Sequence, residues 1–178
     1  MILRDLLRVL GSNRRDGRNL THQEAYRAFG TILDGPASEV QTGAFLIAMR
    51  FKGVTVEELT GFARAARDRA KLPCEGVRGL VSISSPHDGS ERHPPLDVAS
   101  GVIAAAAGAR VLLVTERCVP PRRGLTAANV LEHLGAQLTW DPSEVEDWVV
   151  KTRFGAIAAS GMLPGLLAPT GAAAPVRE

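Results

Sequence analysis

The sequence contains only two cysteines, Cys74 and Cys118, and four histidines, and none of them has the clustered spacing of a metal site. A disulfide framework is therefore excluded and no metal ligand is predicted. No uncharged apolar run approaches the length of about 18 residues that a membrane-spanning helix needs. Arg4 and Asp5 interrupt the apolar N-terminus, so it lacks the core of a secretory signal. These absences predict a cytoplasmic protein with no membrane partner.

Net charge is also small, since the formal value is +2 at pH 7. The arginines are nevertheless concentrated in two segments that contain no lysine. Residues 1–18 hold five arginines against two aspartates, and residues 110–123 hold four arginines against one glutamate. Clustered arginines contact phosphate groups, and the alternative interpretation is a pair of solvated loops. The candidate phosphate or nucleic-acid contacts are Arg14, Arg15, Arg18, Arg117, Arg122 and Arg123.

One local pattern predicts three helix starts, namely a hydroxyl N-cap residue followed three positions later by Glu or Gln. The pairs are Thr21 with Glu24, Ser38 with Gln41, and Thr55 with Glu58. Apolar residues at helical spacing follow each start and are expected to face a core: Ala25, Phe29, Ile32 and Leu33, then Ala44, Ile47, Ala48 and Phe51, then Leu59, Phe62, Ala63 and Ala66. With an opening helix near residues 2–10, the pattern predicts a four-helix domain over residues 1–72.

From residue 76 the periodicity changes to short apolar runs separated by helical segments, which is typical of a parallel α/β sheet. The runs are 80–83, 110–114 and 155–159, and the helices are 96–107, 126–134 and a segment that starts at Asp141 and Pro142. The tail 163–178 has no predicted element. The predicted fold class is α/β, with an N-terminal four-helix domain followed by a partial parallel α/β domain over residues 76–178.

The segment 33–59, LDGPASEVQTGAFLIAMRFKGVTVEEL, resembles the helical N-terminal domain of the anthranilate phosphoribosyltransferase and pyrimidine nucleoside phosphorylase superfamily. Weaker similarity continues in the family's order through residues 104–111, 130–135 and 174–177. The resemblance implies a helical domain that forms a homodimer interface and a phosphoribosyltransferase-like α/β domain. It also implies a truncated chain, since the family's α/β domain continues beyond the position that matches Glu178.

The phosphate loop departs from the family's pattern. After the first strand, family members read Gly-Thr-Gly-Gly-Asp-Gly, whose glycines let backbone N–H groups approach a pyrophosphate. The matching positions 84–89 read Ser-Ser-Pro-His-Asp-Gly, so only Asp88 and Gly89 are retained. Pro86 removes one N–H donor and fixes φ. The resemblance therefore implies a phosphate site that has lost its backbone cradle.

Two further substrate-contacting segments of the family are altered. The family's Asn-Ile-Ser-Thr falls on residues 95–98, which read Pro-Leu-Asp-Val, and Asp97 would repel phosphate. The family's His-Gly-Asn falls on residues 114–116, which read Val-Thr-Glu. Both changes replace groups that bind phosphoribose.

Positive charge is retained at three positions that the resemblance assigns to ligand binding. Arg117 matches a family arginine, Arg122 falls where a phosphate-binding lysine is expected, and Arg177 matches the residue that meets the anthranilate carboxylate. The carboxylates that hold magnesium in the family match positions beyond residue 178.

Three functions are compatible with this sequence. The first is a degenerate, non-catalytic, anthranilate phosphoribosyltransferase-like pseudoenzyme that binds nucleic acid or phosphate groups through arginine-rich loops, like paralogues that lack the glycine loop. The second is a phosphoribosyl or glycosyl transferase with an altered site, for which magnesium would be the cofactor; otherwise no cofactor is expected. The third is a structural remnant without its own activity. The altered phosphate loop favours the first.

Overall fold

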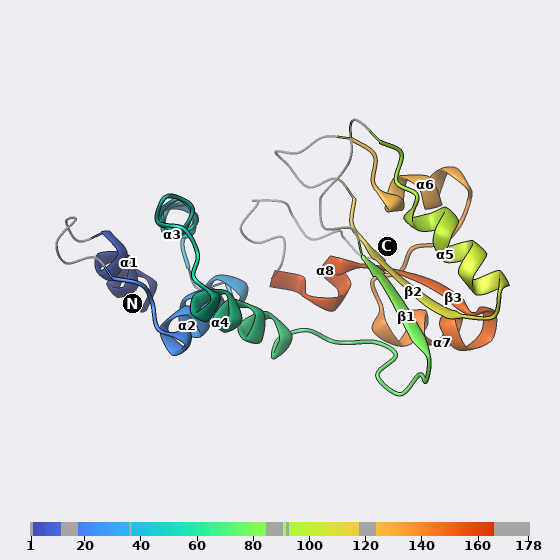
Figure 1. The fold of residues 1–178 in the computed structure, drawn as a ribbon, viewed down its shortest axis with the longest axis horizontal. Helices are drawn as coiled ribbons and strands as arrows, with labels where there is room; N and C mark the ends of the chain where they lie inside the picture. Colours follow the sequence, from blue (N-terminus) through green and yellow to red (C-terminus); the bar gives the residue numbers. More distant parts are fainter. Residues whose placement is uncertain are drawn as a thin grey trace. The chain divides into compact units, whose positions relative to one another are not determined.

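A computed structural model describes residues 2–11, 18–35, 37–84, 91, 93–117 and 124–165 (Figure 1). The chain divides into two compact units, Met1–Ala70 with Gly165–Arg177, and Lys71–Pro164 with Glu178. The first unit is a helical bundle and the second is built on a parallel three-stranded sheet. The predicted fold class is confirmed. Within the described ranges, no helix is long and apolar enough to cross a membrane.

The helical unit contains α1 (Ile2–Gly11), α2 (His22–Leu33), α3 (Glu39–Lys52) and α4 (Val56–Arg67). The capping boxes predicted at Thr21 and Thr55 are both present, so each threonine hydroxyl and its partner glutamate satisfy backbone N–H groups reciprocally. Ser38 caps α3 by accepting the N–H of Gln41 at 3.2 Å. The local signals therefore place the starts of α2, α3 and α4 correctly.

Buried apolar side chains from α1, α2, α3 and the segment before α2 form the core of this unit: Leu3, Leu6, Leu20, Ala25, Ala28, Ile32, Phe45 and Met49. Phe62 of α4 packs against this core, with its ring centroid 5.3 Å from that of Phe29 and 6.0 Å from that of Phe45. Helices α2 and α4 approach closely at Gly61, where an added Cβ would lie 2.5 Å from the His22 carbonyl oxygen. Any side chain at position 61 would force the two helices apart.

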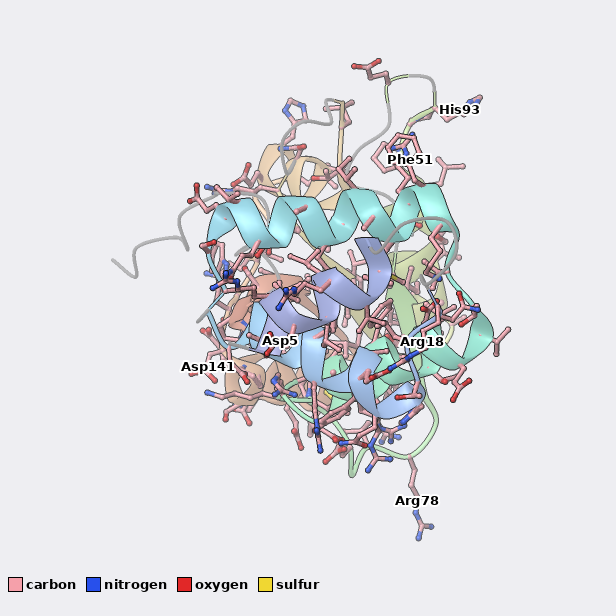
Figure 2. All side chains as sticks on the ribbon, turned by 90° about the vertical axis from the view of Figure 1, so that its left-hand side faces the viewer. Asp5, Arg18, Phe51, Arg78, His93 and Asp141 are labelled. Carbon is pink, nitrogen blue, oxygen red and sulfur yellow. The ribbon has the colours of Figure 1, made fainter. Side chains whose placement is uncertain are left out.

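The prediction of which side of α3 faces the core is wrong. Ile47 and Phe51 are 54% and 85% exposed, whereas Thr42, Phe45 and Met49 on the opposite side of the helix are buried. Figure 2 shows Phe51 at the end of α3, with its ring directed away from the bundle. The helix has two apolar sides, and periodicity alone does not distinguish which one packs inward.

Helix α4 differs from its prediction in the same way, because Leu59 is exposed and the neighbouring Glu58 is fully buried. Glu58 Oε1 accepts the N–H of Leu20 at 2.8 Å, while Oε2 accepts the N–H of Thr55 at 2.9 Å and a hydrogen bond from Lys52 Nζ at 2.8 Å. Desolvation by burial alone would raise the pKa of Glu58. The hydrogen bonds from Lys52, Thr55 and Leu20 outweigh this effect, so the pKa is lowered and the buried carboxylate stays ionised.

The second unit is built on strands β1 (Leu80–Ser84), β2 (Arg110–Thr115) and β3 (Phe154–Ala158). They lie in the order β1-β2-β3 and pair in parallel, with Leu80 opposite Arg110 and Val111 opposite Phe154. Helices α5 (Asp97–Ala106), α6 (Ala127–His133) and α7 (Pro142–Thr152) connect them, and α8 (Ala159–Met162) follows β3. The alternation of strands and helices predicted after residue 76 is observed.

Helices cover both faces of this sheet, with α5 and α6 on one face and α7 on the other (Figure 1). Leu113 and Ala156 point toward the α5 and α6 face, where Val98 and Leu131 complete one core. Leu112 and Ile157 point toward the opposite face and pack with Val145 and Val149 of α7. Adjacent residues of one strand therefore enter different cores, as the period of two in a strand requires.

Two features of this unit were not predicted. Thr126 and Asn129 form a capping box at the start of α6, where Asn129 takes the place of the usual glutamate or glutamine. The short helix α8 also lies within a segment that has no helical sequence pattern. The predicted start of α7 is confirmed, because Asp141 Oδ1 accepts the N–H of Ser143 at 2.8 Å and Pro142 occupies the first turn.

Replacement of Glu58 by Gln tests the buried carboxylate. Glu58→Gln is expected to lower the free energy of unfolding by about 2–4 kcal/mol, because the amide directs an NH2 donor at groups that themselves donate. The stability that Glu58 supplies is present above the ordinary glutamate pKa and is lost as pH falls through its lowered folded value. Urea denaturation at neutral and acidic pH measures both effects.

The matched control is Glu39→Gln, which changes an exposed carboxylate in the first turn of α3. This variant should cost no more than about 1 kcal/mol through the helix dipole. Equal losses in the two variants would show that the buried network adds no stability.

Candidate functional site

The three parallel strands end at one edge of the sheet, after Ser84, Thr115 and Ala158. Ligands of open α/β sheets bind outside the carboxyl ends of the strands. The segments that the family resemblance assigns to phosphoribose binding begin at this edge. The polar groups that follow each strand are therefore the candidate site.

Glu116, the residue after β2, connects the ends of two strands. Its Oε2 accepts the N–H of Ser160 at 2.9 Å, and its Oε1 accepts the N–H of Arg117 at 3.1 Å. Ser160 lies in the first turn of α8, whose N-cap residue Ala158 makes no side-chain capping bond. The Glu116 carboxylate supplies that cap from the neighbouring strand, which places a negative charge at the carboxyl edge of the sheet.

Arg117 forms an ion pair with Glu132, which belongs to α6. Both side chains are largely exposed to solvent, so this pair contributes little to stability. The positive charge of Arg117 is nevertheless balanced by a neighbouring carboxylate. The predicted phosphate contact at this position is therefore already occupied by a partner within the protein.

Two backbone donors in the first turn of α6 are also satisfied. The buried Thr115 Oγ1 accepts the N–H of Ala128 at 3.2 Å, and the Thr126 Oγ1 accepts the N–H of Asn129 at 3.3 Å. Because these amides have protein acceptors, they do not present a free anion-binding cradle to a ligand.

Helix α5 begins with Asp97 in its first turn, and its N-cap residue Leu96 makes no side-chain capping bond. A carboxylate at this end of a helix interacts favourably with the helix dipole. It also repels a phosphate that approaches the same amides. That Asp97 opposes phosphate binding stays a prediction.

Arg18 lies in the helical unit and is held by Glu24 of α2. The guanidinium donates to both carboxylate oxygens, at 2.7 Å and 2.6 Å. The Arg18 side chain, through its hydrogen bonds, and the backbone N–H of Thr21 together lower the pKa of Glu24 to about 2. Phosphate binding by Arg18 stays a prediction, and in the structure this residue reinforces the capping box that starts α2.

Most of the predicted site lies outside the described residues: Arg14, Arg15, Asp88, Gly89, Arg122, Arg123 and Arg177. Of the predicted contacts, the structure places Arg18 and Arg117, which lie in different units and each pair with a glutamate. Across the described part of the chain, no group of three or more His, Cys, Asp or Glu side chains could hold a metal ion.

Sequence reasoning missed the partners of these residues. Glu132 is 15 positions from Arg117 and lies on another element, and Ser160 is 44 positions from Glu116. No local pattern connects such pairs. The one available signal was Glu116 itself, a single acidic residue within an arginine-rich segment.

Comparisons with known proteins support the fold. Residues 12–70 match the family described as "Glycosyl transferase family, helical bundle domain". The crystal structure of anthranilate phosphoribosyltransferase from Thermus thermophilus superposes with a TM-score of 0.74 at 24% identity, covering 94% of this chain and 48% of that one. The architecture is thus a glycosyl transferase helical bundle joined to a parallel α/β unit.

The sequence relatives of the chain are anthranilate phosphoribosyltransferases. Anthranilate phosphoribosyltransferase of Brevibacillus brevis is 41% identical over 133 residues, which are 74% of this chain and 38% of the relative. The enzyme of Acetivibrio thermocellus is 33% identical over 144 residues, or 81% of this chain and 41% of the relative. The chain is therefore similar to anthranilate phosphoribosyltransferases, and part of it matches the glycosyl transferase helical bundle domain. It spans about 40% of the length of these two relatives.

Removal of the Arg18 side chain tests its role as a structural partner of Glu24. In Arg18→Ala, the pKa of Glu24 should rise from about 2 toward its ordinary value, because the largest cause of the lowering is removed. The stability that this pair contributes is present above the ordinary glutamate pKa and is lost as pH falls toward 2. NMR titration of the Glu24 carboxyl carbon measures the shift. The control is Arg27→Ala, an exposed arginine of α2, which should leave Glu24 unchanged.

Proposed function

We propose that this protein is a non-catalytic member of its family that binds nucleic acid, or another chain of phosphate groups, through its arginine-rich segments. The observation that carries the proposal is the Glu116 carboxylate at the end of β2, which caps α8 through Ser160. The resemblance places a phosphoribose-binding asparagine at this position. A carboxylate there repels the substrate phosphates that such a transferase must bind.

The other altered segments act in the same direction. Asp97 adds a second carboxylate near the carboxyl edge of the sheet, in the first turn of α5. The segment 84–89 contains Ser, Pro and His where the family has glycines, so side chains replace the close approach of backbone amides to phosphate. Loss of preorganised donors and gain of negative charge both reduce stabilisation of a transferring phosphoribosyl group.

Polyanion binding needs positive charge but no amide cradle. Arg14, Arg15, Arg122 and Arg123 supply this charge, and Arg117 can join them, because its exposed ion pair with Glu132 is weak enough for a phosphate to displace. Arg18 is left out of the proposed contacts, since Glu24 engages its guanidinium at two positions. Binding of this kind depends on phosphate number and salt, and not on base sequence.

The test is binding of a labelled oligonucleotide at about 50 and 200 mM salt, where a protein with several phosphate contacts loses affinity by orders of magnitude. The triple variant Arg14→Glu, Arg15→Glu, Arg122→Glu should weaken binding at low salt by about 10-fold or more and flatten the salt dependence. The control is Arg78→Glu, which reverses an exposed charge next to the amino end of β1 (Figure 2) and should have little effect.

Calorimetry with phosphoribosyl pyrophosphate and magnesium distinguishes the alternatives. Binding of the sugar phosphate without oligonucleotide binding would overturn the proposal in favour of a transferase with an altered site. Absence of binding to either ligand would favour the interpretation as a structural remnant without its own activity. Oligonucleotide binding that is insensitive to salt and to the triple variant would also contradict the proposal.

We also propose that the protein forms a homodimer through α3. Val40, Ala44, Ile47 and Phe51 are exposed and recur at intervals of four, three and four residues, on the side opposite the buried Phe45 and Met49. This spacing gives one continuous apolar stripe along the helix, and it is the spacing with which two helices interdigitate. An exposed apolar stripe without charge marks a protein contact, and the family resemblance favours a second copy of the chain.

Phe51→Glu should weaken this dimer about 100-fold or more, because it places a charge within the apolar contact. Sedimentation at a series of concentrations measures the change in dissociation constant. The matched control is Val150→Glu on α7, which adds the same charge at another exposed apolar position. A chain that remains monomeric in its native form, or two variants with equal effects, would contradict the α3 interface.

A further inference from the structure

Two arginines on neighbouring strands lie at the amino edge of the sheet, which is the edge opposite the candidate site. Arg110 is the first residue of β2, and Arg153 directly precedes β3. Val111 pairs with Phe154, and the Val111 N–H donates to the Arg153 carbonyl at 2.8 Å. Arg110 and Arg153 are therefore the next opposed positions. Neighbouring strands are about 4.8 Å apart, so the two side chains begin close together.

The positive charges of this arginine pair are not balanced by nearby acids. Among the described residues, no carboxylate forms an ion pair with either guanidinium, and both side chains are exposed. Two carboxylates of α7 are engaged elsewhere, since Asp147 pairs with Lys151 at 2.7 Å and Glu146 accepts the N–H of Cys74 at 3.0 Å. Like charges on opposed strand positions repel each other.

Local contacts hold both guanidinium groups at the edge. Arg110 Nη1 donates to the carbonyl oxygen of Arg78 at 3.1 Å. The Arg153 guanidinium lies against the turn after α5, where its Nη1 would be 3.7 Å from a Cβ at Gly108. The Arg153 backbone is in the left-handed region, with a φ of 66°, and forms the C-cap of α7. Groups that are already positioned lose less conformational entropy when they bind an anion.

The helix dipole accounts for only one of these positions. The last turn of α5 contains no basic residue, and a cation near a helix C-terminus is favourable, so Arg153 stabilises that end of α5. This interaction leaves the repulsion between Arg153 and Arg110 in place. An anion between the two guanidinium groups would replace that repulsion with two attractions.

We propose that Arg110 and Arg153 form a binding site for a phosphate dianion, either inorganic phosphate or a terminal phosphate monoester. Each guanidinium presents a planar fork of donors that matches two phosphate oxygens, and a dianion balances two cations. Arg78 supplies only its carbonyl oxygen, and Figure 2 shows its side chain extended outward. The site is on the opposite edge of the sheet from Glu116, whose carboxylate would repel the same ligand.

The test is an NMR titration of the 178-residue protein with inorganic phosphate at about pH 8, where phosphate is mostly a dianion. At constant ionic strength, the Nε–H resonances of Arg110 and Arg153 should shift and saturate. Arg110→Gln and Arg153→Gln should each weaken phosphate binding about 10-fold or more, because each removes charge-assisted hydrogen bonds. The matched control is Arg78→Gln, which removes an exposed arginine of the same edge and should change the affinity less than about 3-fold.

Two organic phosphates distinguish the source of the dianion. Methyl phosphate should bind as tightly as inorganic phosphate if the ligand is a terminal monoester, and more weakly if it is free phosphate. Dimethyl phosphate carries a single charge and should bind at least about 10-fold more weakly than either. Equal binding of the diester, shifts that do not saturate, or unchanged affinity in either folded Gln variant would overturn the site. Circular dichroism checks that the variants are folded.

This site is independent of the proposed polyanion contacts. An oligonucleotide with blocked ends presents only phosphate diesters, so Arg110→Gln should change its affinity less than about 3-fold. Absence of oligonucleotide binding would leave the phosphate titration unaffected. If Arg110→Gln weakens oligonucleotide and phosphate binding equally, the two arginines belong to a general polyanion surface, and the inference of a separate dianion site is wrong.

Discussion

The helical unit depends on one buried carboxylate. Glu58 accepts hydrogen bonds from Leu20, which precedes α2, from Lys52 at the end of α3, and from Thr55 at the start of α4. The buried charge of Glu58 is tolerated because these donors all form hydrogen bonds with the carboxylate. Removal of any one of them would leave part of the desolvation penalty uncompensated. Three chain segments are thus fixed at one point, which sets the angles at which the helices enter the core.

A carboxylate also accepts hydrogen bonds from backbone amides at the end of the sheet. Glu116 uses its two oxygens to cap α8 and to hold the N–H of Arg117. In each unit a carboxylate organises backbone amides, and at the sheet this carboxylate occupies a position for which the resemblance predicts a phosphoribose contact. Structural order at the strand ends is thus obtained with negative charge, and the neighbouring Arg117 is itself paired with Glu132.

The sequence predicted what depends on local chemistry. Capping pairs such as Thr21 with Glu24 involve neighbours in the chain, so helix starts were placed well, and the change of periodicity at residue 76 correctly predicted a parallel sheet. The inward side of α3 was wrong because Ile47 and Phe51 mimic a core stripe while Phe45 and Met49 form the real one. The partners of Arg117 and Glu116 depend on tertiary structure, which no spacing rule describes.

The strand order β1-β2-β3 follows the order of the chain, and both connections are local. During synthesis, each new strand can therefore add to the edge made just before it. The side of β1 that faces away from β2 is exposed first and is not covered by any later described strand. The side of β1 that faces away from β2 is therefore the oldest edge of this sheet, and growth of the described sheet proceeds from its other side.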